Sequence, residues 1–385
     1  MQLVAYGAQD IYLTGNPQIT FFKVVYRRHT NFSMEAIEQT WNGTADGGDS
    51  RCTATISRNG DLVHRMYLEF EVSTGVADKD NATAAAITTI EIEIGGQRID
   101  KHSGQWMETW AELTEPNPSG VTHGGDNGAD GTLFQKMSGM GGTEANAGAL
   151  ANGKYFVPLQ FWFCRNPGLA LPLIALQYHE VKIILDHTVS SSLGAAAKNK
   201  LWADYIYLDT DERRRFAQVS HEYLIEQVQE QSVTKNSSAN VDINFNHPVK
   251  FLALSGEDGT ANAIGLVPPV TSGTVQLKLN GHDRFAARDV RYFSRAQVWQ
   301  HFSGAGGLDS TSASGTGAHN DSILVYSFAL KPEEHQPSGT CNFSRIDNAQ
   351  LITSATRANK DQVLYAVNYN VLRIMSGMGG LAYSN

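Results

Sequence analysis

Residues 16–33 read NPQITFFKVVYRRHTNFS, and this stretch is the starting point for predicting the fold. Asn16-Pro17 is a turn signal, and a run rich in apolar and β-branched residues follows it over residues 19–26. The basic pair Arg27-Arg28 then ends the run. This order predicts an N-terminal strand over residues 19–26 that leads into a β-sandwich.

The composition is typical of an all-β protein with two domains. A length of 385 residues exceeds one ordinary domain, and 41% hydrophobic residues are enough for a core in each half. Only 18% of the residues are charged while 36 are glycines, and glycine supplies the turns that a protein with many strands needs.

The charge balance argues against a protein that coats nucleic acid. The formal net charge is −9, whereas binding to phosphate backbones needs clustered Lys and Arg. The basic runs at residues 27–28 and 213–215 are short, and we interpret them as solvated or salt-bridged edges. We therefore expect no direct contact with nucleic acid.

The cysteines and the chain start indicate the compartment. Cys52, Cys164 and Cys341 lie far apart and are odd in number, so we expect unpaired thiols in a reducing environment. Neither a zinc-ligand spacing nor a cofactor motif occurs. The N-terminus lacks the features of a signal peptide, and no apolar run approaches the roughly 20 residues of a membrane span. These features predict a soluble protein made in the cytosol.

The two halves of the chain share one plan. Residues 90–94 (IEIEI) alternate strictly before Gly95-Gly96, and residues 275–279 (VQLKL) alternate before Asn280-Gly281. Both halves then have the order apolar run, proline-containing loop and β-forming run, at residues 155–164, 165–172 and 174–185 and at residues 323–330, 331–339 and 349–353. We interpret this as two divergent copies of one β-sandwich.

Other segments refine this plan. Residues 363–371 alternate near the C-terminus and predict an interior strand of the second sandwich. Ser103 is a candidate cap for a helix that ends at Leu113. Residues 209–219 predict a charged linker or helix at the domain boundary. The glycine-rich residues 116–153 and 303–320 predict long surface excursions.

Three further segments carry a family resemblance. They read FWFCRNPGLALPLIALQYHEVKIIL at residues 161–185, YSFALKPEEHQPSGTCNFSRIDNAQL at 326–351 and NYNVLRIMSGMGGLAYSN at 368–385. Together with residues 16–33 they run in order from the start to the end of the chain. The four segments closely resemble the double jelly-roll major capsid proteins of nucleocytoplasmic large DNA viruses.

The resemblance implies an all-β fold of two tandem eight-stranded jelly rolls with few short helices. Combined with the linker prediction, it divides the chain into an N-terminal extension at residues 1–19, a first roll at 20–208, a linker at 209–219 and a second roll at 220–385. A jelly roll closes two sheets over a core and leaves few unprotected strand edges.

The resemblance also implies the function and the partners. It predicts a structural, non-enzymatic subunit of an icosahedral virus capsid that forms pseudo-hexagonal homotrimers, assembled in the host cytoplasm. The implied partners are neighbouring capsomers, minor capsid proteins and, indirectly, an internal virion membrane. Residues 1–15 are expected to lie at the inner side, against minor capsid proteins or the base of the next subunit.

The search for chemistry predicts no catalytic, metal or cofactor site. Glu333-Glu334-His335 is the best cluster, but Pro332 and Pro337 favour a structural loop. His179-Glu180 and His221-Glu222 are neighbours in strand-like runs, where adjacent side chains diverge. Other motifs are weaker still, namely a calcium-like loop at residues 126–131, which lacks EF-hand spacing, and SGMGG at 138–142 and 376–380, which does not fit a phosphate-binding loop.

Six Asn-x-Ser/Thr sequons occur, at Asn31, Asn42, Asn81, Asn236, Asn320 and Asn342. Without a signal peptide the cellular glycosylation pathway would not reach them. The resemblance implies glycans that viral enzymes add at atypical sites in some members. Glycosylation at these loop asparagines is therefore a prediction that the sequence leaves open.

Alternative functions are a minor capsid paralogue, a carbohydrate-binding β-sandwich of the virion and a jelly-roll enzyme that processes glycans. A lectin needs exposed aromatic side chains at one loop end, and a hydrolase needs two converging carboxylates. The sequence shows neither, and core packing is the favoured interpretation for Trp106, Trp110, Trp162 and Trp299.

Overall fold

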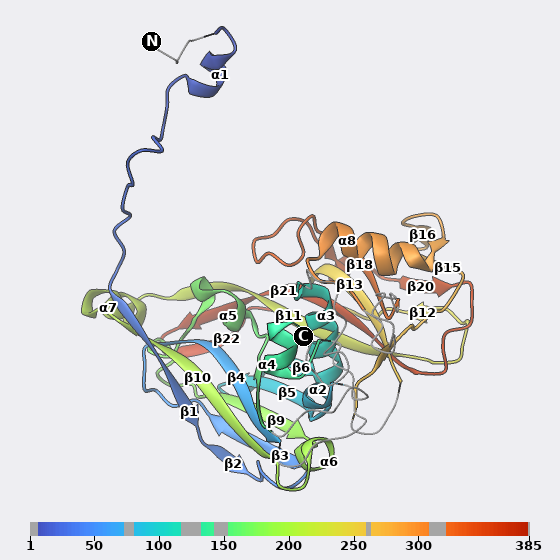
Figure 1. Ribbon diagram of the computed structural model, residues 1–385, viewed down its shortest axis with the longest axis horizontal. Coiled ribbons are helices and arrows are strands. Elements are labelled where there is room, and N and C mark those ends of the chain that lie inside the picture. Colours follow the sequence, from blue (N-terminus) through green and yellow to red (C-terminus); the bar gives the residue numbers. More distant parts are fainter. Residues whose placement is uncertain are drawn as a thin grey trace.

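The computed structural model describes residues 7–72, 81–116, 132–141, 153–258, 263–307 and 321–383. Four antiparallel sheets dominate it, two formed by strands of residues 32–208 and two by strands of residues 221–381. Figure 1 shows the two pairs of sheets side by side, joined through the short helix α7, Thr210–Gln218.

The first half contains two sheets. Sheet 1 has the strand order β1-β10-β4-β7, with β8 also paired to β4, and its bounds are β1 Phe32–Gln39, β4 Leu62–Val72, β7 Gly153–Pro158, β8 Leu171–Pro172 and β10 Lys198–Leu208. Sheet 2 has the order β2-β3-β9-β5-β6, with bounds β2 Trp41–Gly43, β3 Ser50–Thr55, β5 Ile87–Ile94, β6 Gln97–Ser103 and β9 Val181–His187.

The second half repeats this arrangement. Sheet 3 has the order β11-β21-β13-β14, with β18 and β19 on β13 and β22 on β21; the bounds are β11 His221–Val233, β13 Pro248–Glu257, β14 Leu266–Val267, β18 Ile323–Ser327, β19 Cys341–Asn342, β21 Asp361–Met375 and β22 Met378–Leu381. Sheet 4 has the order β12-β20-β15-β16, with β17 on β15; the bounds are β12 Val241–Asp242, β15 Thr274–Leu279, β16 His282–Asp283, β17 Arg288–Asp289 and β20 Ala349–Thr353.

The helices are short, as predicted. They are α1 Asp10–Thr14, α2 Ala82–Ala85, α3 Gly104–Thr114, α4 Leu133–Ser138, α5 Trp162–Arg165, α6 Val189–Leu193, α7 Thr210–Gln218 and α8 Gln297–His301, with a π-helical turn at Tyr292–Ala296 and 3₁₀ turns at Pro167–Leu169 and Phe343–Arg345. No helix among the described residues is both long enough and apolar enough to cross a membrane.

Predictions that depend only on residues close together along the chain are confirmed. Side chains of β5 and β15 alternate between buried and partly exposed, as predicted. The dipeptides Gly95-Gly96 and Asn280-Gly281 both have positive φ at both residues, which a two-residue type I′ hairpin requires. Helix α3 begins after Ser103, whose Oγ accepts a hydrogen bond from the Trp106 amide.

Each pair of sheets encloses a core of its own. Met66 and Leu201 of sheet 1 meet Ile92 and Leu185 of sheet 2 in the first core. In the second core, residues such as Leu252 of sheet 3 pack against residues of sheet 4 such as Leu277 and Leu351. The chain therefore folds as two β-sandwiches.

A third core joins the two sandwiches. Trp106 and Trp110 of α3, from the first half, pack against Phe251, Tyr365 and Val367 of sheet 3. Because Leu364 and Ala366 on the opposite side of β21 belong to the second core, sheet 3 is buried on both faces. Strand β21 pairs with β11 on one side and β13 on the other, so the prediction of an interior strand at residues 363–371 is confirmed.

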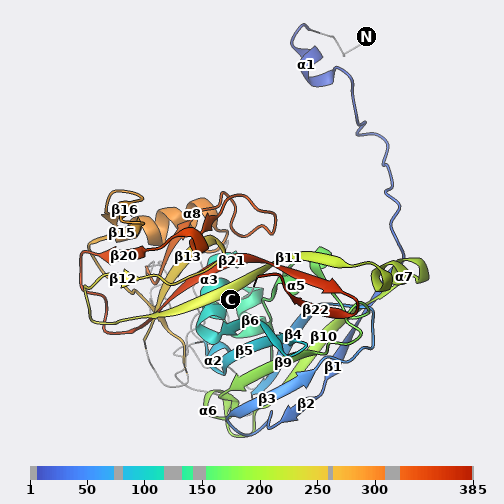
Figure 2. The same ribbon diagram turned by 180° about the vertical axis from the view of Figure 1, so that it is seen from behind.

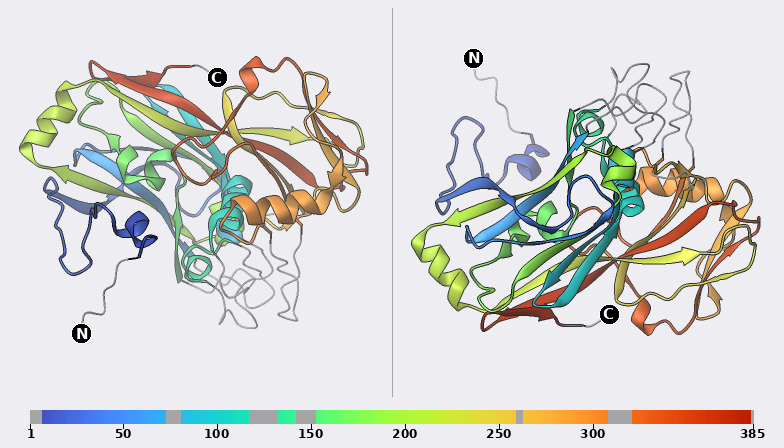
Figure 3. Two further views of the ribbon diagram at one scale, coloured as in Figure 1. Left: turned by 90° about the horizontal axis from the view of Figure 1, so that it is seen from above. Right: turned by 90° about the horizontal axis from the view of Figure 1, so that it is seen from below.

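The two halves also interlock along their strands. In Figures 1 and 2, β11 and β21 extend from the second sandwich across the first. Their ends reach the first core, since Ile225, Leu372 and Ile374 belong to that cluster. The views in Figure 3 show the same two long strands passing over the first half.

The predicted N-terminal strand at residues 19–26 is wrong. The first strand of the sandwich, β1, begins at Phe32, and residues 17–31 form an irregular arm without a strand partner. Figures 1 and 2 show the arm leaving the body beside α7 and ending near α1. A β-forming composition produces a strand only where a neighbouring strand can pair with it, and composition does not reveal that neighbour. The predicted strand at residues 174–185 is likewise confirmed only from Val181.

Candidate functional site

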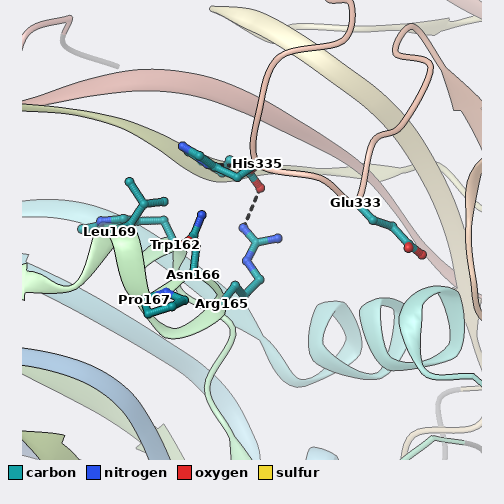
Figure 4. Close-up of a pocket in the computed structure, with 8 residues that line it drawn as sticks. Trp162, Arg165, Asn166, Pro167, Leu169, Glu333 and His335 are labelled. Carbon is teal, nitrogen blue, oxygen red and sulfur yellow. Dashed lines mark ion pairs between the residues drawn. The ribbon is translucent and has the colours of Figure 1, made fainter. Parts of the chain in front are cut away.

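A group of buried and partly buried charges lies where the two halves meet. Arg165 comes from α5, Glu226 from β11, Lys250 from β13 and His335 from the loop that follows β18. We call these four residues the charge cluster. It borders a pocket of about 170 Å³, and Figure 4 shows Arg165 and His335 entering this pocket from opposite walls.

The Glu226 carboxylate is the centre of the charge cluster. Its Oε1 accepts from Lys250 Nζ at 2.9 Å and lies 3.5 Å from His335 Nδ1, while its Oε2 is 2.8 Å from an Arg165 guanidinium nitrogen. Glu226 is 4% exposed and Lys250 is 1% exposed. Both charges are therefore removed from water and compensated inside the protein.

Lys250 and Arg165 make further contacts that stabilise their positive charges. Lys250 Nζ also donates to the Glu334 carbonyl oxygen at 2.9 Å and lies 5.0 Å from the centre of the Tyr369 ring. The Arg165 guanidinium lies 4.7 Å from the ring centre of Trp110 on α3. The cluster thus links α5, α3, sheet 3 and the loop at residues 331–339.

The protonation states follow from this geometry. Burial alone would raise the pKa of Glu226, but Arg165, His335 and Lys250 outweigh it and lower this pKa to about 2. Burial lowers the pKa of Lys250, although Glu226 acts against that shift. The carboxylate is therefore ionised throughout the physiological range and acts as a fixed anion that accepts hydrogen bonds.

The charge cluster predicts a specific loss of stability in acid. A carboxyl whose pKa is lower in the folded than in the unfolded chain stabilises the fold above its unfolded pKa, about 4.3, and this contribution disappears as the pH falls towards about 2. We expect the melting temperature of the wild type to fall more steeply between about pH 5 and pH 2 than that of Glu226→Gln. Differential scanning fluorimetry over this range measures both slopes, and parallel curves would contradict the assignment.

The cluster offers no machinery for hydrolysis. Glu333, the other carboxylate beside the pocket, accepts from the Ser303 amide at 2.7 Å and from its hydroxyl at 2.9 Å. Glu334 pairs with Lys331 at the surface, at 2.9 Å. Residues 333–335 therefore form a structural loop, as predicted, because each side chain has a different partner. Among the described residues, no group of three or more His, Cys, Asp or Glu side chains could hold a metal ion.

The paired His-Glu candidates have separate partners, although only His221-Glu222 lie in a strand as predicted, since β9 begins at Val181. His179 Nδ1 accepts from the Gly379 amide at 3.1 Å, whereas His221 Nε2 is 2.8 Å from the Phe216 carbonyl oxygen. Glu222 pairs with Arg373 at 2.8 Å. Each of these groups therefore fixes a turn or a strand end.

The glycine-rich motifs lie in turns. The first SGMGG is described only as far as Gly141; it begins at Ser138, the last residue of α4, and Gly139 after it has a positive φ. The second provides the tight turn between β21 and β22, with positive φ at Ser376 and Gly377. The calcium-like loop at residues 126–131 lies outside the described residues.

The thiols and tryptophans mostly belong to the core. Cys52 and Cys164 are buried, which raises the pKa of each thiol to about 12 and keeps it protonated. Trp106, Trp110 and Trp162 are buried as expected, but Trp299 on α8 is 81% exposed. One exposed tryptophan does not form the aromatic platform of a lectin site.

The six sequon asparagines differ in accessibility. Asn31, Asn42, Asn236 and Asn342 are exposed, whereas Asn320 lies outside the described residues. Asn81 is 4% exposed, and its amide donates to the Ile264 carbonyl oxygen at 2.9 Å. A glycan on Asn81 would require this hydrogen bond to break, so we restrict the glycosylation prediction to the four exposed residues and Asn320.

Sequence reasoning missed Arg165, Glu226 and Lys250, the core of the charge cluster. These residues come from three elements that are distant along the chain, so their spacing carries no motif. One signal was present, because Lys250 interrupts the apolar run of β13, whose residues from Val249 to Ser255 are all buried. A lysine inside such a run must have a buried partner.

Comparisons with known proteins cover the whole chain. Residues 20–209 match the family model "Major capsid protein N-terminus", and residues 212–380 match "Large eukaryotic DNA virus major capsid protein". The chain is 52% identical over 403 residues to the major capsid protein of Pyramimonas orientalis virus and 41% identical over 459 residues to that of Paramecium bursaria Chlorella virus 1. Both alignments include 100% of this chain and 99% of the relative.

Solved structures show the same similarity. The capsid subunit in a quasi-atomic model of the PBCV-1 virus capsid superposes with a TM-score of 0.76 at 37% identity, over 95% of this chain and 100% of that one. The Faustovirus major capsid protein superposes with a TM-score of 0.63 over 96% of this chain and 94% of that one. Its identity is only 14%, so that likeness shows the fold alone.

Proposed function

Since the chain belongs to the family of major capsid proteins of large eukaryotic DNA viruses, we propose that three copies of it form a capsomer of pseudo-hexagonal outline. The chain is a structural subunit of an icosahedral virus capsid, and not an enzyme. Its two β-sandwiches are the double jelly roll of this family. Identity along the full length of major capsid proteins favours the major subunit over a minor paralogue.

The observation that carries the trimer proposal is the rigid pairing of two sandwiches in one chain. Three such chains supply six sandwiches, which approximates a six-fold tile. The third core and the charge cluster join the halves, so each chain acts as one body. Contacts between neighbouring subunits recur over the whole shell, and each of them can therefore be weak.

We assign the rolls to residues 20–208 and 220–385, with residues 209–219 as the linker and residues 1–19 as an extension. The two family models, which match residues 20–209 and 212–380, support this division. Helix α7 lies in the linker, and the four sheets separate on either side of it. The expectation of eight strands per roll is not matched one for one, since the described residues form ten strands in the first half and twelve in the second, several of them only two residues long.

The partners extend beyond the lattice of neighbouring subunits. We expect the exposed N-terminal residues to contact minor capsid proteins on the inner side of the shell. Any contact with an internal virion membrane is then indirect, and assembly takes place in the host cytoplasm. The net charge of −9 supports the absence of direct contact with nucleic acid.

Sedimentation of the purified protein tests the proposal. We expect a single species with the mass of three 42.0 kDa chains at micromolar concentration. Negative-stain images should show particles of hexagonal outline. A monodisperse monomer would contradict the trimer.

Deletion of residues 1–14 tests the role of the N-terminus. This segment includes α1, which has no buried residue, so we expect the deletion to leave the fold and the trimer intact. Assembly of larger shells should decrease because contacts beyond the trimer are lost. Negative-stain counts of shells formed by wild type and deletion, with sedimentation as the control, measure this; equal shell formation would contradict the role.

A further inference from the structure

The N-terminal arm, residues 17–31, exposes an unusual amount of apolar surface. Ile19, Phe21, Phe22, Val24, Val25 and Tyr26 are each 72–98% exposed. The arm is also strongly basic, because Lys23, Arg27 and Arg28 are present and residues 11–34 contain neither Asp nor Glu. Such a segment gains free energy when a surface that is both apolar and acidic covers it.

A groove with those properties lies beside α7. It has a volume of about 780 Å³, and its apolar lining includes Leu62, Leu208, Phe216 and Tyr223. Leu62 belongs to a small core with Ala170 and Ile206, against which Leu208 and Phe216 pack. The floor of the groove is therefore rigid and apolar.

The charged residues that line the groove are mainly acidic. Asp211, Glu212 and Glu222 line it, whereas Arg215 is the single lysine or arginine among its lining residues. Glu222 already pairs with Arg373, so Asp211 and Glu212 are the acids available to a ligand. The Oε2 atom of Glu212 is buried and has no hydrogen-bonding partner in the described part of the protein. Glu212 thus adds an acidic group to the groove that its own chain leaves without a donor at one oxygen, and this charge favours a basic ligand.

The arm of the same chain is poorly placed to fill this groove. Thr30, at the root of the arm, lines the groove, and the arm leaves the body from there (Figures 1 and 2). To return, the chain would have to reverse at its root, where residues 27–31 read RRHTN and offer Asn31 as the single turn-forming residue. The turn-forming residues Gly15, Asn16 and Pro17 lie at the opposite end of the arm.

We propose that residues 19–28 of each copy dock into the α7 groove of the neighbouring copy within the trimer, an inference that rests on the trimer proposed above. Ten extended residues span about 33 Å, which is long enough to cross a subunit boundary. A contact in which one copy presents the arm and the next presents the groove is head-to-tail, and such contacts close into a ring when the rotation matches. In the docked arrangement the aromatic side chains cover the apolar floor, and Arg27 and Arg28 lie against Asp211 and Glu212.

Photo-crosslinking tests the docking directly. Phe22 is replaced by p-benzoylphenylalanine in the full chain, and sedimentation first confirms the trimer. After irradiation we expect dimers and trimers that survive denaturing electrophoresis. Mass spectrometry should join the arm to peptides that contain residues 167–170 or 208–223. The matched control is the same replacement at Tyr12, which is 92% exposed in α1 and should not link to these peptides.

The outcomes separate this inference from the proposed trimer. A trimer whose arm links only to its own chain, or to no groove peptide, would overturn the arm exchange and leave the trimer standing. A monomer before irradiation would overturn both. A cross-link that joins the arm to another virion protein, and forms only when that protein is present, would assign the arm to a minor capsid protein. This result would also overturn the exchange.

Charge exchange gives a second, independent measurement. Arg27→Glu combined with Arg28→Glu places like charges together and should reduce the cross-link yield about tenfold, the equivalent of about 1.4 kcal/mol. Adding Asp211→Arg and Glu212→Arg should restore most of the yield. If the two groove replacements fail to restore it while the trimer stays intact, the assigned contact is wrong.

Discussion

Replacement of Val367 by aspartate is expected to abolish folding of the protein to a soluble state. Val367 is 1% exposed and lies in the core that joins the two sandwiches, beside Tyr365, Phe251 and the tryptophans of α3. Its strand β21 is paired on both sides, so the carboxylate could not turn towards water. A buried charge without a partner costs about 3–5 kcal/mol or more, which is a large part of the usual 5–15 kcal/mol of total stability.

Solubility and thermal unfolding measure this effect. The matched control is Met375→Asp, which places the same charge on the same strand at a side chain that is 54% exposed. We expect the control to remain soluble, with a melting temperature within a few degrees of the wild type. A soluble trimer of Val367→Asp with unchanged thermal stability would show that the third core is not closed.

Replacement of Glu226 by alanine is expected to have an effect of similar size by a different route. Removal of this carboxylate leaves the buried Lys250, which is 1% exposed, and the partly buried Arg165 as neighbouring cations without their anion. Breaking a buried ion pair from one side costs about 3–5 kcal/mol. Because the cluster bridges α5 and sheet 3, the loss should appear as weaker attachment of the two halves to each other.

Two comparison variants make this measurement specific. Glu230, on the same strand, pairs with Lys101 at 2.8 Å, but both side chains are about one-third exposed, so Glu230→Ala should cost only about 0–1 kcal/mol. The double variant Glu226→Gln with Lys250→Met removes both opposite charges and should recover part of the stability lost in Glu226→Ala. Chemical denaturation measures all three, and equal costs for Glu226→Ala and Glu230→Ala would refute the role of burial.

The sequence predicts those parts of the fold that depend on neighbours along the chain. Alternation over residues 90–94, the Ser103 cap of α3 and the Asn280-Gly281 turn each act within a few residues, and each is confirmed. The strand at residues 19–26 failed because pairing depends on a distant segment. The charge cluster was missed for the same reason, since Arg165 and Glu226 are separated by three strands and two α-helices.

The shared strand β21 has a consequence for how the protein is made. Its residues 361–375 complete sheet 3, and two of them, Leu372 and Ile374, also belong to the core of the first sandwich. We therefore expect both cores to be completed only after residues 361–375 have left the ribosome, so that the final packing of the two rolls follows their synthesis. Nascent and truncated chains lack the folded surface through which a subunit contacts its neighbours. Only complete subunits would therefore be competent to enter a growing shell.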